Sequence, residues 1–218
     1  MFFKGSSQGI SIYSPAKINL FLEITGKDNQ GYHLLDTIMQ TVSLYDVLTL
    51  KPAKRFSLKC NIPIPEGQNL VYKAWRLLEE TLSQKLPVEI LLNKAIPVGA
   101  GLGGGSSNAV ATLLGLNKLF ELQLSKEKLI ALARQLGADC PFFLYGGTCL
   151  CSNRGDKIEE QLLIRDMYWV IIYPDIHICT KKIFENFRLT HKSFCGKKIF
   201  NLLKEKRYSE CIHLYLNR

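Results

Sequence analysis

The chain has 218 residues, of which 47% are hydrophobic; this is enough to bury the core of one large or two modest domains and argues against disorder. No signal-peptide pattern follows Met1 and no apolar run has the length of a membrane span, so we expect a cytoplasmic protein with no membrane partner. The formal net charge is +9, but the Lys and Arg residues form no long basic tract, so we expect solvated surface charge and no nucleic-acid partner.

Residues 9–24 are expected to form two extended pieces on either side of Pro15. In the second piece apolar and polar side chains alternate, which is typical of a strand with one buried face. Side chains two positions apart lie on the same face of a strand, so Lys17 and Asn19 should point the same way.

A polar turn is predicted at residues 26–31, and Tyr32 and His33 follow it directly. Both side chains are therefore placed to project into a cleft. Further strands are expected at residues 41–51 and at residues 56–60, and a proline-rich segment ends the second of these.

Helices and strands alternate from Asn69 onward. Asn69 is expected to cap a helix that ends near Leu82, and a strand is expected at residues 88–92. A nearly all-apolar stretch at residues 109–120 predicts a buried helix, in which Gly115 would permit close packing.

The rest of the chain continues the mixture of helix and strand. Ser125 is expected to start a helix that Gly137 ends. Residues 167–173 predict a buried strand, and residues 181–218 predict short helices. This order of elements indicates an α+β fold.

The seven cysteines form no C-x-x-C pair. Cys149 and Cys151 are two positions apart and would share one face of a strand. We expect reduced, partly buried thiols and no metal site.

The most informative segment is rich in glycine. Residues 99–105 contain five glycines, and Ser106, Ser107 and Asn108 follow them. Glycine lets the backbone adopt a positive φ and approach a ligand closely, and Ser and Asn are natural caps at the start of a helix. Because a helix start exposes unpaired N–H groups and carries partial positive charge, this segment predicts a phosphate-binding site.

Three other interpretations of this segment fit its residues less well. The Walker pattern fails because Ser106, not lysine, follows Gly105. The dinucleotide pattern G-x-G-x-x-G is matched, but its confirming acid should end a strand, and Glu121 instead lies between two helical stretches. A purely structural glycine turn is disfavoured, because five glycines precede the two serines.

Residues 97–107 resemble the phosphate loop of the GHMP kinases, a superfamily that includes galacto-, homoserine, mevalonate and phosphomevalonate kinases. Residues 14–20, 31–33 and 136–141 resemble three motifs of one branch, which phosphorylates a cytidine-diphosphate-linked methylerythritol in the non-mevalonate isoprenoid pathway. The four motifs occur in the family's order and at compatible spacing.

The resemblance implies a two-domain GHMP kinase fold. Residues 1–157 would form an N-terminal ATP-binding domain similar to domain 2 of ribosomal protein S5, and residues 158–218 an incomplete C-terminal α+β domain. The family carries a third glycine-rich segment near its C-terminus, which this sequence lacks. We therefore expect part of the second domain to be missing.

The resemblance also implies an ATP-dependent kinase acting on the 2-hydroxyl of that substrate. Asp139 would be the catalytic base, with Lys17 beside it, and Asn19 would lie near the reacting end of the substrate. An ammonium group next to a carboxylate keeps the carboxylate ionised and attracts phosphate oxygens. Taken without the motifs, Asp139 would instead cap a helix and Lys17 would be a surface lysine.

In the same family, an aromatic sandwich holds the cytosine. By resemblance, Tyr32 would stack on the base, His33 would hydrogen-bond to it, and Phe184 would form the opposite wall.

ATP would bind along the glycine-rich segment, with its nucleoside near two residues upstream of it. The implied ATP-binding residues are Asn69, Lys94, Pro97, Val98, Gly99, Ala100, Gly101, Leu102, Gly103, Gly104, Gly105, Ser106 and Ser107. Mg²⁺ is expected as a bridge between phosphates, and no protein ligand for it is predicted.

Two alternatives stay open at this point: another small-molecule GHMP kinase, or a truncated kinase that binds nucleotide without catalysis. A basic nucleic-acid-binding module is a weaker third, because aromatic and basic residues do not gather on one strand.

Overall fold

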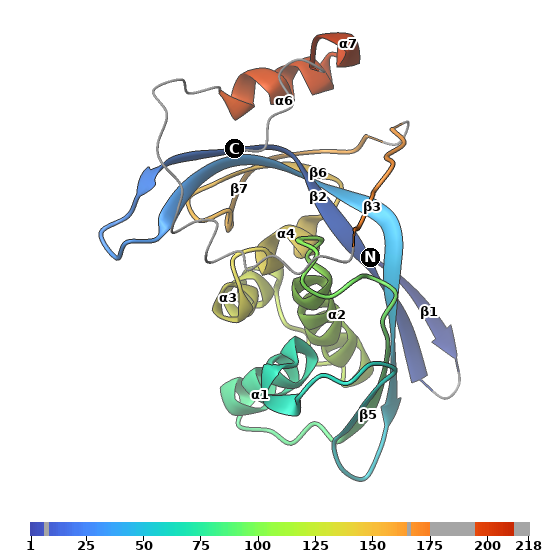
Figure 1. Cartoon of the computed structure of the whole chain (residues 1–218). Coiled ribbons are helices and arrows are strands. Elements are labelled where there is room, and N and C mark those ends of the chain that lie inside the picture. Colours follow the sequence, from blue (N-terminus) through green and yellow to red (C-terminus); the bar gives the residue numbers. More distant parts are fainter. Residues whose placement is uncertain (7–8, 165–166, 175–194, 212–218) are drawn as a thin grey trace. The chain divides into compact units, whose positions relative to one another are not determined.

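The computed structural model describes residues 1–6, 9–164, 167–174 and 195–211 (Figure 1). By their contacts, the residues divide into two compact units. The first unit comprises Met1–Ala16, Ser43–Val98 and Leu102–Leu144, and the second comprises Lys17–Val42, Gly99–Gly101 and Tyr145–Arg218. Strands β2 (Gly9–Lys27) and β3 (His33–Pro52) contribute a section to each unit, so the division does not follow chain order.

The first unit contains β1 (Phe2–Ser6), β4 (Ser57–Cys60) and β5 (Val88–Asn93), together with sections of β2 and β3. The strand order is β1-β2-β3-β5-β4. β1 pairs antiparallel with β2 and β5 pairs antiparallel with β3, whereas β4 and β5 run parallel. Parallel neighbours need a crossover connection, which is made here by the short helix η1 (Glu66–Gln68) and α1 (Leu70–Leu82).

Figure 1 shows α1, α2 (Gly104–Leu119) and α3 (Lys126–Leu136) gathered on one side of these strands, and α4 (Cys140–Tyr145) completes the unit. Asn69 caps α1 by accepting a hydrogen bond from the Val71 N–H at 3.0 Å. Ser125 caps α3 by accepting one from the Lys128 N–H at 3.3 Å. Both predicted caps are confirmed.

Helix α2 is buried, as its apolar sequence predicts, and Leu113 and Leu116 are fully buried. A Cβ atom at Gly115 would lie 2.5 Å from Ile12 Cδ1 and 2.8 Å from Leu50 Cδ2. Gly115 therefore lets α2 lie directly against β2 and β3, and the close packing expected there is confirmed.

The second unit contains sections of β2 and β3 together with β6 (Thr148–Ser152), β7 (Lys157–Leu162), α6 (Gly196–Lys204) and α7 (Tyr208–Cys211). β6 pairs antiparallel with both β3 and β7. The apolar core of the second unit contains strand side chains such as Phe21 and Ile38, together with Ile199 and Phe200 of α6. Lys204 of α6 also forms a 2.5 Å ion pair with Glu160 of β7.

The predicted break in the first long strand is wrong, because β2 runs without interruption through Pro15. Proline removes a backbone donor and normally weakens a strand interior. The pairing of β1 with β2 ends at Tyr13, opposite Phe2, so Pro15 lies beyond it and its missing N–H breaks no hydrogen bond to β1.

The buried strand predicted at residues 167–173 is also wrong. These residues adopt no regular structure, and the side chains of Tyr168, Val170 and Ile172 are 97%, 92% and 85% exposed. An apolar run forms a strand only where a neighbouring strand takes up its hydrogen bonds, and none of the strands that the structure describes pairs with it. Of the short helices predicted after residue 181, α6 and α7 are present within residues 195–211.

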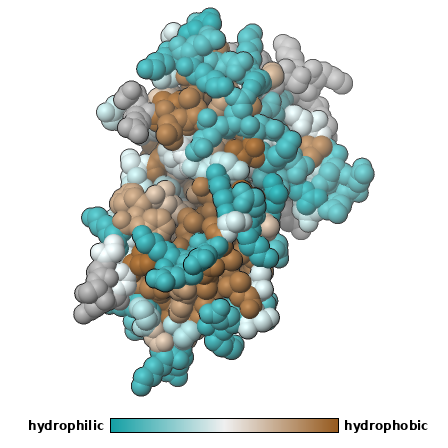
Figure 2. All heavy atoms as spheres, turned by 180° about the vertical axis from the view of Figure 1, so that it is seen from behind, coloured by the Kyte–Doolittle hydropathy of each residue, from teal (hydrophilic) through white to brown (hydrophobic). Residues whose placement is uncertain are grey.

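Part of the positive charge at the surface is balanced by ion pairs with acidic side chains. Lys59 pairs with Glu89 at 2.8 Å, and Lys85 pairs with Glu79 at 3.4 Å. On the face drawn in Figure 2, hydrophilic side chains form most of the protruding surface and hydrophobic ones lie between them. Across the described ranges, no helix combines the length and the apolar character that crossing a membrane requires.

The predicted boundary between residues 157 and 158 falls at the start of β7, which pairs with β6. A separate domain at residues 158–218 stays a prediction.

The cysteines are free thiols where the structure describes them. Cys149 and Cys151 are both fully buried on β6, whereas Cys60 is half-buried and Cys195 is exposed, so the thiols are partly buried as a group, as expected.

Candidate active site

The glycine-rich segment needs its glycines for backbone geometry. Gly99, Gly101 and Gly103 have φ values of 74°, 73° and 68°, a region that side chains disfavour. Helix α2 begins at Gly104, and Gly103 takes the cap position without a side-chain cap. The expectation that Ser106 and its two neighbours cap this helix is therefore wrong, because the preceding glycine turn starts the helix earlier.

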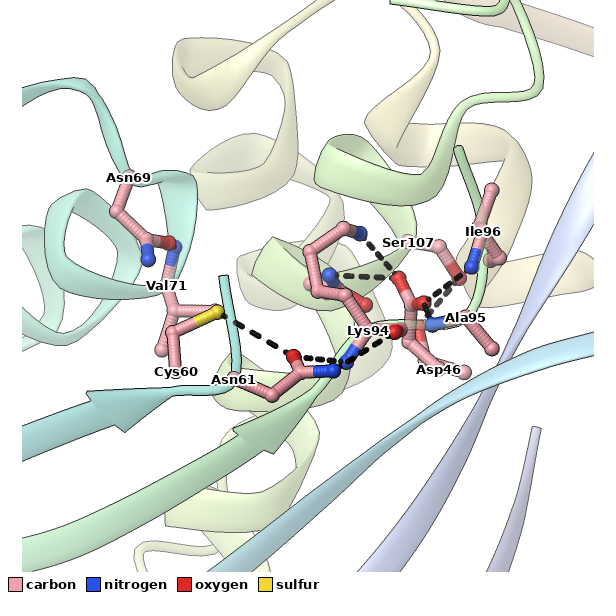
Figure 3. A network of polar contacts seen from close by, with 11 residues as sticks. Asp46, Cys60, Asn61, Asn69, Val71, Lys94, Ala95, Ile96 and Ser107 are labelled. Atoms are coloured by element: carbon pink, nitrogen blue, oxygen red, sulfur yellow. Dashed lines mark hydrogen bonds and ion pairs between the residues drawn. The ribbon is translucent and has the colours of Figure 1, made fainter. Parts of the chain in front are cut away.

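One buried carboxylate joins the segment before the glycines to the helix after them (Figure 3). Asp46 of β3 accepts hydrogen bonds from the N–H groups of Ala95 and Ile96, both at 2.8 Å, and from Asn108 Nδ2 at 2.9 Å. It also forms an ion pair with Lys94, and the two side chains are 0% and 5% exposed. The entry and exit of the glycine-rich segment are thus fixed to the same strand.

Lys94 also lies against the first residue of α2. A Cβ atom at Gly104 would lie 3.2 Å from Lys94 Nζ and 2.9 Å from Ile96 Cγ2. Because Asp46 already neutralises this ammonium group, the potential for anions at this point comes mainly from the unpaired N–H groups of the helix start. The side chains of Ile96 and Lys94 fill the space beside the Gly104 Cα, so only glycine fits at this first position of the helix.

Asp139 lies between α3 and α4, next to the first turn of α2. The Ser106 side chain hydrogen-bonds to the Cys140 thiol, and a Cβ atom at Gly137 would lie 3.8 Å from Ser106 Oγ. Burial raises the pKa of Cys140 to about 12; the hydrogen bond from Ser106 opposes this rise and the charge of Asp139 adds to it. The backbone on either side of Asp139 therefore lies beside the start of α2, and a phosphoryl-transfer site must combine a carboxylate with such a helix start.

Other predicted ATP-binding residues have structural contacts as well. Ser107 is fully buried and accepts a hydrogen bond from Ser14 Oγ at 2.6 Å, which ties α2 to β2. Asn69 caps α1 and is buried. In the segment before α2, Leu102 is buried whereas Val98 is 57% exposed.

In the second unit, Lys17 and Asn19 share a face, as predicted. Lys17 Nζ donates to Asn19 Oδ1 at 2.6 Å, and Asn19 Nδ2 donates to Thr37 Oγ1 at 2.8 Å. Thr37 Oγ1 in turn donates to the Phe21 carbonyl at 2.6 Å. Lys17 is only 6% exposed, so the alternative of a surface lysine is wrong.

The predicted base-binding residues lie at the turn between β2 and β3. Tyr32 is 57% exposed, and His33 is the first residue of β3. The guanidinium carbon of Arg154 lies 3.9 Å from the centre of the Tyr32 ring, a contact that the sequence did not predict. Phe184 lies outside the described residues.

A resident metal site was not predicted. Within the part of the chain that the structure describes, no three His, Cys, Asp or Glu side chains are grouped so that they could hold a metal ion.

Comparison with known proteins identifies the class. The GHMP kinases N terminal domain family matches residues 69–147, which contain α1, the glycine-rich segment and Asp139. A crystal structure of homoserine kinase from Cytophaga hutchinsonii has a TM-score of 0.57 over 91% of this chain and 65% of that one, at 18% identity, which supports the fold alone. The fold and the phosphate-loop segment are those of the GHMP kinases.

More similar proteins define the family within this class. The 4-diphosphocytidyl-2-C-methyl-D-erythritol kinase of Macrococcus caseolyticus is 39% identical over 94% of this chain and 75% of its own length. The corresponding enzyme of Clostridium tetani is 44% identical over 80% of this chain and 64% of its own length. A crystal structure titled 4-(cytidine 5'-diphospho)-2C-methyl-D-erythritol kinase superposes with a TM-score of 0.72 at 33% identity, covering 90% of this chain and 72% of that one.

The chain belongs to the 4-diphosphocytidyl-2-C-methyl-D-erythritol kinase family. It spans 64% of the length of the Clostridium tetani relative.

Proposed function

We propose that this chain transfers the γ-phosphoryl group of ATP to the 2-hydroxyl of 4-diphosphocytidyl-2-C-methyl-D-erythritol. The names of the similar proteins support the reaction class and the substrate. The observation that supports the proposal is that Gly137 and Cys140, which flank Asp139 in the chain, lie against Ser106 in the first turn of α2, so that the Asp139 carboxylate and the backbone donors of the helix start could serve one reaction.

The ATP triphosphate would lie along residues 97–107. Backbone N–H groups at the start of α2 would bind the phosphate oxygens, and the Ser106 hydroxyl would add a contact. The buried Asp46 network fixes this backbone before ATP arrives, so little conformational entropy is lost on binding. Asn69 and Lys94 are proposed to lie near the nucleoside.

Asp139 would accept the proton of the acceptor hydroxyl as that oxygen attacks the γ-phosphorus. Lys17 is proposed to place positive charge near the transferred group, and its 2.6 Å hydrogen bond to Asn19 orients it. Asn19 is proposed to contact the reacting end of the substrate. The reaction needs a carboxylate and an ammonium group, and the motifs at residues 136–141 and 14–20 supply Asp139 and Lys17.

The cytosine would stack on the exposed ring of Tyr32, with His33 as a hydrogen-bond partner and Phe184 as the second aromatic wall. Mg²⁺ would enter with ATP, held by phosphate oxygens and water, because the described residues provide no acidic cluster of their own. A cytoplasmic location and the absence of a nucleic-acid partner stay predictions.

A transfer assay with radiolabelled ATP tests this proposal. The chain is incubated with the cytidine-linked methylerythritol, and in parallel with homoserine and with mevalonate as alternative acceptors. We expect label in the cytidine-linked product only, and loss of labelling in Asp139→Asn, which keeps the shape but not the basicity of the side chain. Binding of a non-hydrolysable ATP analogue without any transfer would identify an inactive nucleotide-binding chain and would contradict the proposal.

A further inference from the structure

Two turns of the second unit meet around one arginine. Arg154 lies in the turn between β6 and β7, and the turn between β2 and β3 carries Asp28, Gln30 and Tyr32. Arg154 Nε and Nη2 donate to Asp28 Oδ2 at 2.8 and 2.5 Å, and Nη2 donates to Gln30 Oε1 at 2.6 Å. Three hydrogen bonds thereby fix the position of the planar guanidinium group.

The guanidinium group lies over one face of the Tyr32 ring, with 3.9 Å between the guanidinium carbon and the ring centre. The backbone below the ring is also fixed, because Asp28 Oδ1 accepts hydrogen bonds from the N–H groups of Gln30 and Tyr32, both at 2.9 Å. Tyr32 is nevertheless 57% exposed, so the ring keeps surface for another planar group.

The positive charge of Arg154 is neutralised by Asp28 of the turn between β2 and β3. Burial is the largest single effect on the pKa of Asp28 and raises it, but the hydrogen bonds from Arg154 and from the N–H groups of Tyr32 and Gln30 together hold this pKa below its ordinary value. An arginine neutralised in this way contributes little long-range attraction for a diphosphate. Its distinctive contribution is geometric, because a flat guanidinium group stacks on an aromatic face.

We propose that Arg154 is a positioning residue that holds the Tyr32 ring in place for the substrate's base, so that the cytosine stacks only on the ring face that Arg154 leaves open. This inference rests on the proposed function, in which Tyr32 binds the cytosine. A ring that is ordered before binding loses less rotamer entropy when the base arrives. Arg154 thereby raises the affinity for the cytidine part of the substrate without touching the ATP phosphates.

The test uses cytidine 5′-diphosphate as the probe and isothermal titration calorimetry as the measurement, so that it does not depend on turnover. Tyr32→Ala should weaken binding by at least about tenfold, the size typical of losing one base–aromatic stack. Arg154→Met should weaken it by about fivefold, and this factor should not change between low and high salt. Affinity for an ATP analogue should be unchanged in each variant.

Arg154→Lys separates geometry from charge. Lysine keeps the positive charge next to Asp28 but has no planar fork, so we expect it to bind the probe as weakly as Arg154→Met does. Arg207→Met is the matched control. It removes an arginine of the same unit whose side chain is 49% exposed and pairs with Glu205 and Glu210, and the affinity for the probe should stay at the original value. Thermal unfolding checks that each variant is folded, and Arg154→Lys replaces Arg154→Met if the latter is not.

The outcomes separate the inference from the proposed function. Full affinity in Arg154→Met together with weak binding in Tyr32→Ala would overturn the inference alone. Restored affinity in Arg154→Lys would also overturn it, because charge and not planar stacking would then suffice. Full affinity in Tyr32→Ala would overturn the cytosine-binding role of Tyr32 itself.

Discussion

The start of α2 is packed so tightly that two adjacent glycines should respond in opposite ways to the same substitution. A Cβ atom at Gly104 would lie 2.9 Å from Ile96 Cγ2 and 3.1 Å from Ile96 Cβ. Ile96 is 2% exposed and its N–H is bonded to Asp46, so it cannot move away without disturbing the Asp46 network. A Cβ atom at Gly105 would lie 3.4 Å from Leu70 Cδ1, which is an ordinary contact.

Alanine in place of glycine in a helix stabilises the folded state by up to about 1 kcal/mol. Overpacking a filled site costs about 1–3 kcal/mol. Gly105→Ala should gain the helix stabilisation alone, whereas Gly104→Ala should gain the same stabilisation but also be destabilised by overpacking. Gly104→Ala should therefore be the less stable variant by about 1–3 kcal/mol.

Urea denaturation of the two variants and of the original chain measures this difference. An ATP analogue should also bind Gly104→Ala more weakly than the original chain, because a displaced Ile96 moves the backbone that leads into the glycine-rich segment. If Gly104→Ala is as stable as Gly105→Ala, the tight packing at the start of α2 is refuted.

Three further predictions concern buried or half-buried groups. Asp46→Asn should lower the free energy of unfolding, measured by denaturant titration, by about 3–5 kcal/mol, because it leaves the buried Lys94 ammonium group without its counter-charge. A loss below about 1 kcal/mol would contradict a stabilising role for this buried ion pair. At pH 8, iodoacetamide should modify the exposed Cys195 and leave Cys140 intact in the folded protein, because burial raises the Cys140 pKa to about 12. Peptide mapping by mass spectrometry measures the modification of each cysteine, and rapid labelling of Cys140 would contradict the prediction. Burial raises the pKa of Asp36 and outweighs the hydrogen bond that its carboxylate accepts from the Gly196 N–H, so the folded state binds the carboxyl proton more tightly than the unfolded state does. The contribution of this group to the free energy of unfolding is therefore complete below its ordinary pKa and is lost as the pH rises through the raised pKa of the folded state. Asp36→Asn should flatten that part of the pH–stability curve, and an unchanged slope would show that Asp36 is not its source.

Local signals in the sequence were sufficient for elements that depend on neighbours in the chain. Asn69 and Ser125 cap their helices as predicted, because a cap needs only the residues two or three positions ahead. The same holds for Lys17 and Asn19, whose shared face follows from strand geometry alone.

Elements that depend on distant partners were predicted less well. The apolar residues 167–173 have the composition of a buried strand, but pairing with another strand decides whether one forms. Pro15 was expected to break a strand, yet the break depends on where the neighbouring strand stops, which sequence alone does not give.

Two residues of the candidate site were missed for the same reason. Asp46 is separated by about fifty positions from the backbone groups it binds, and Arg154 by more than one hundred from Tyr32. A weak signal existed for Asp46, which is the one charged residue in the mainly apolar segment 45–50 and therefore needs a partner if it is buried. No comparable signal marked Arg154, which looks like any charged residue in a turn.

We propose that the segment around the start of α2 binds the triphosphate of ATP while Asp139 faces the acceptor hydroxyl. A crystal structure of the chain with a non-hydrolysable ATP analogue and the cytidine-linked methylerythritol tests it directly. We expect phosphate oxygens against the N–H groups of residues 101–107 and the 2-hydroxyl within about 3 Å of the Asp139 carboxylate. A triphosphate bound elsewhere, or an Asp139 side chain directed away from that hydroxyl, would contradict the account.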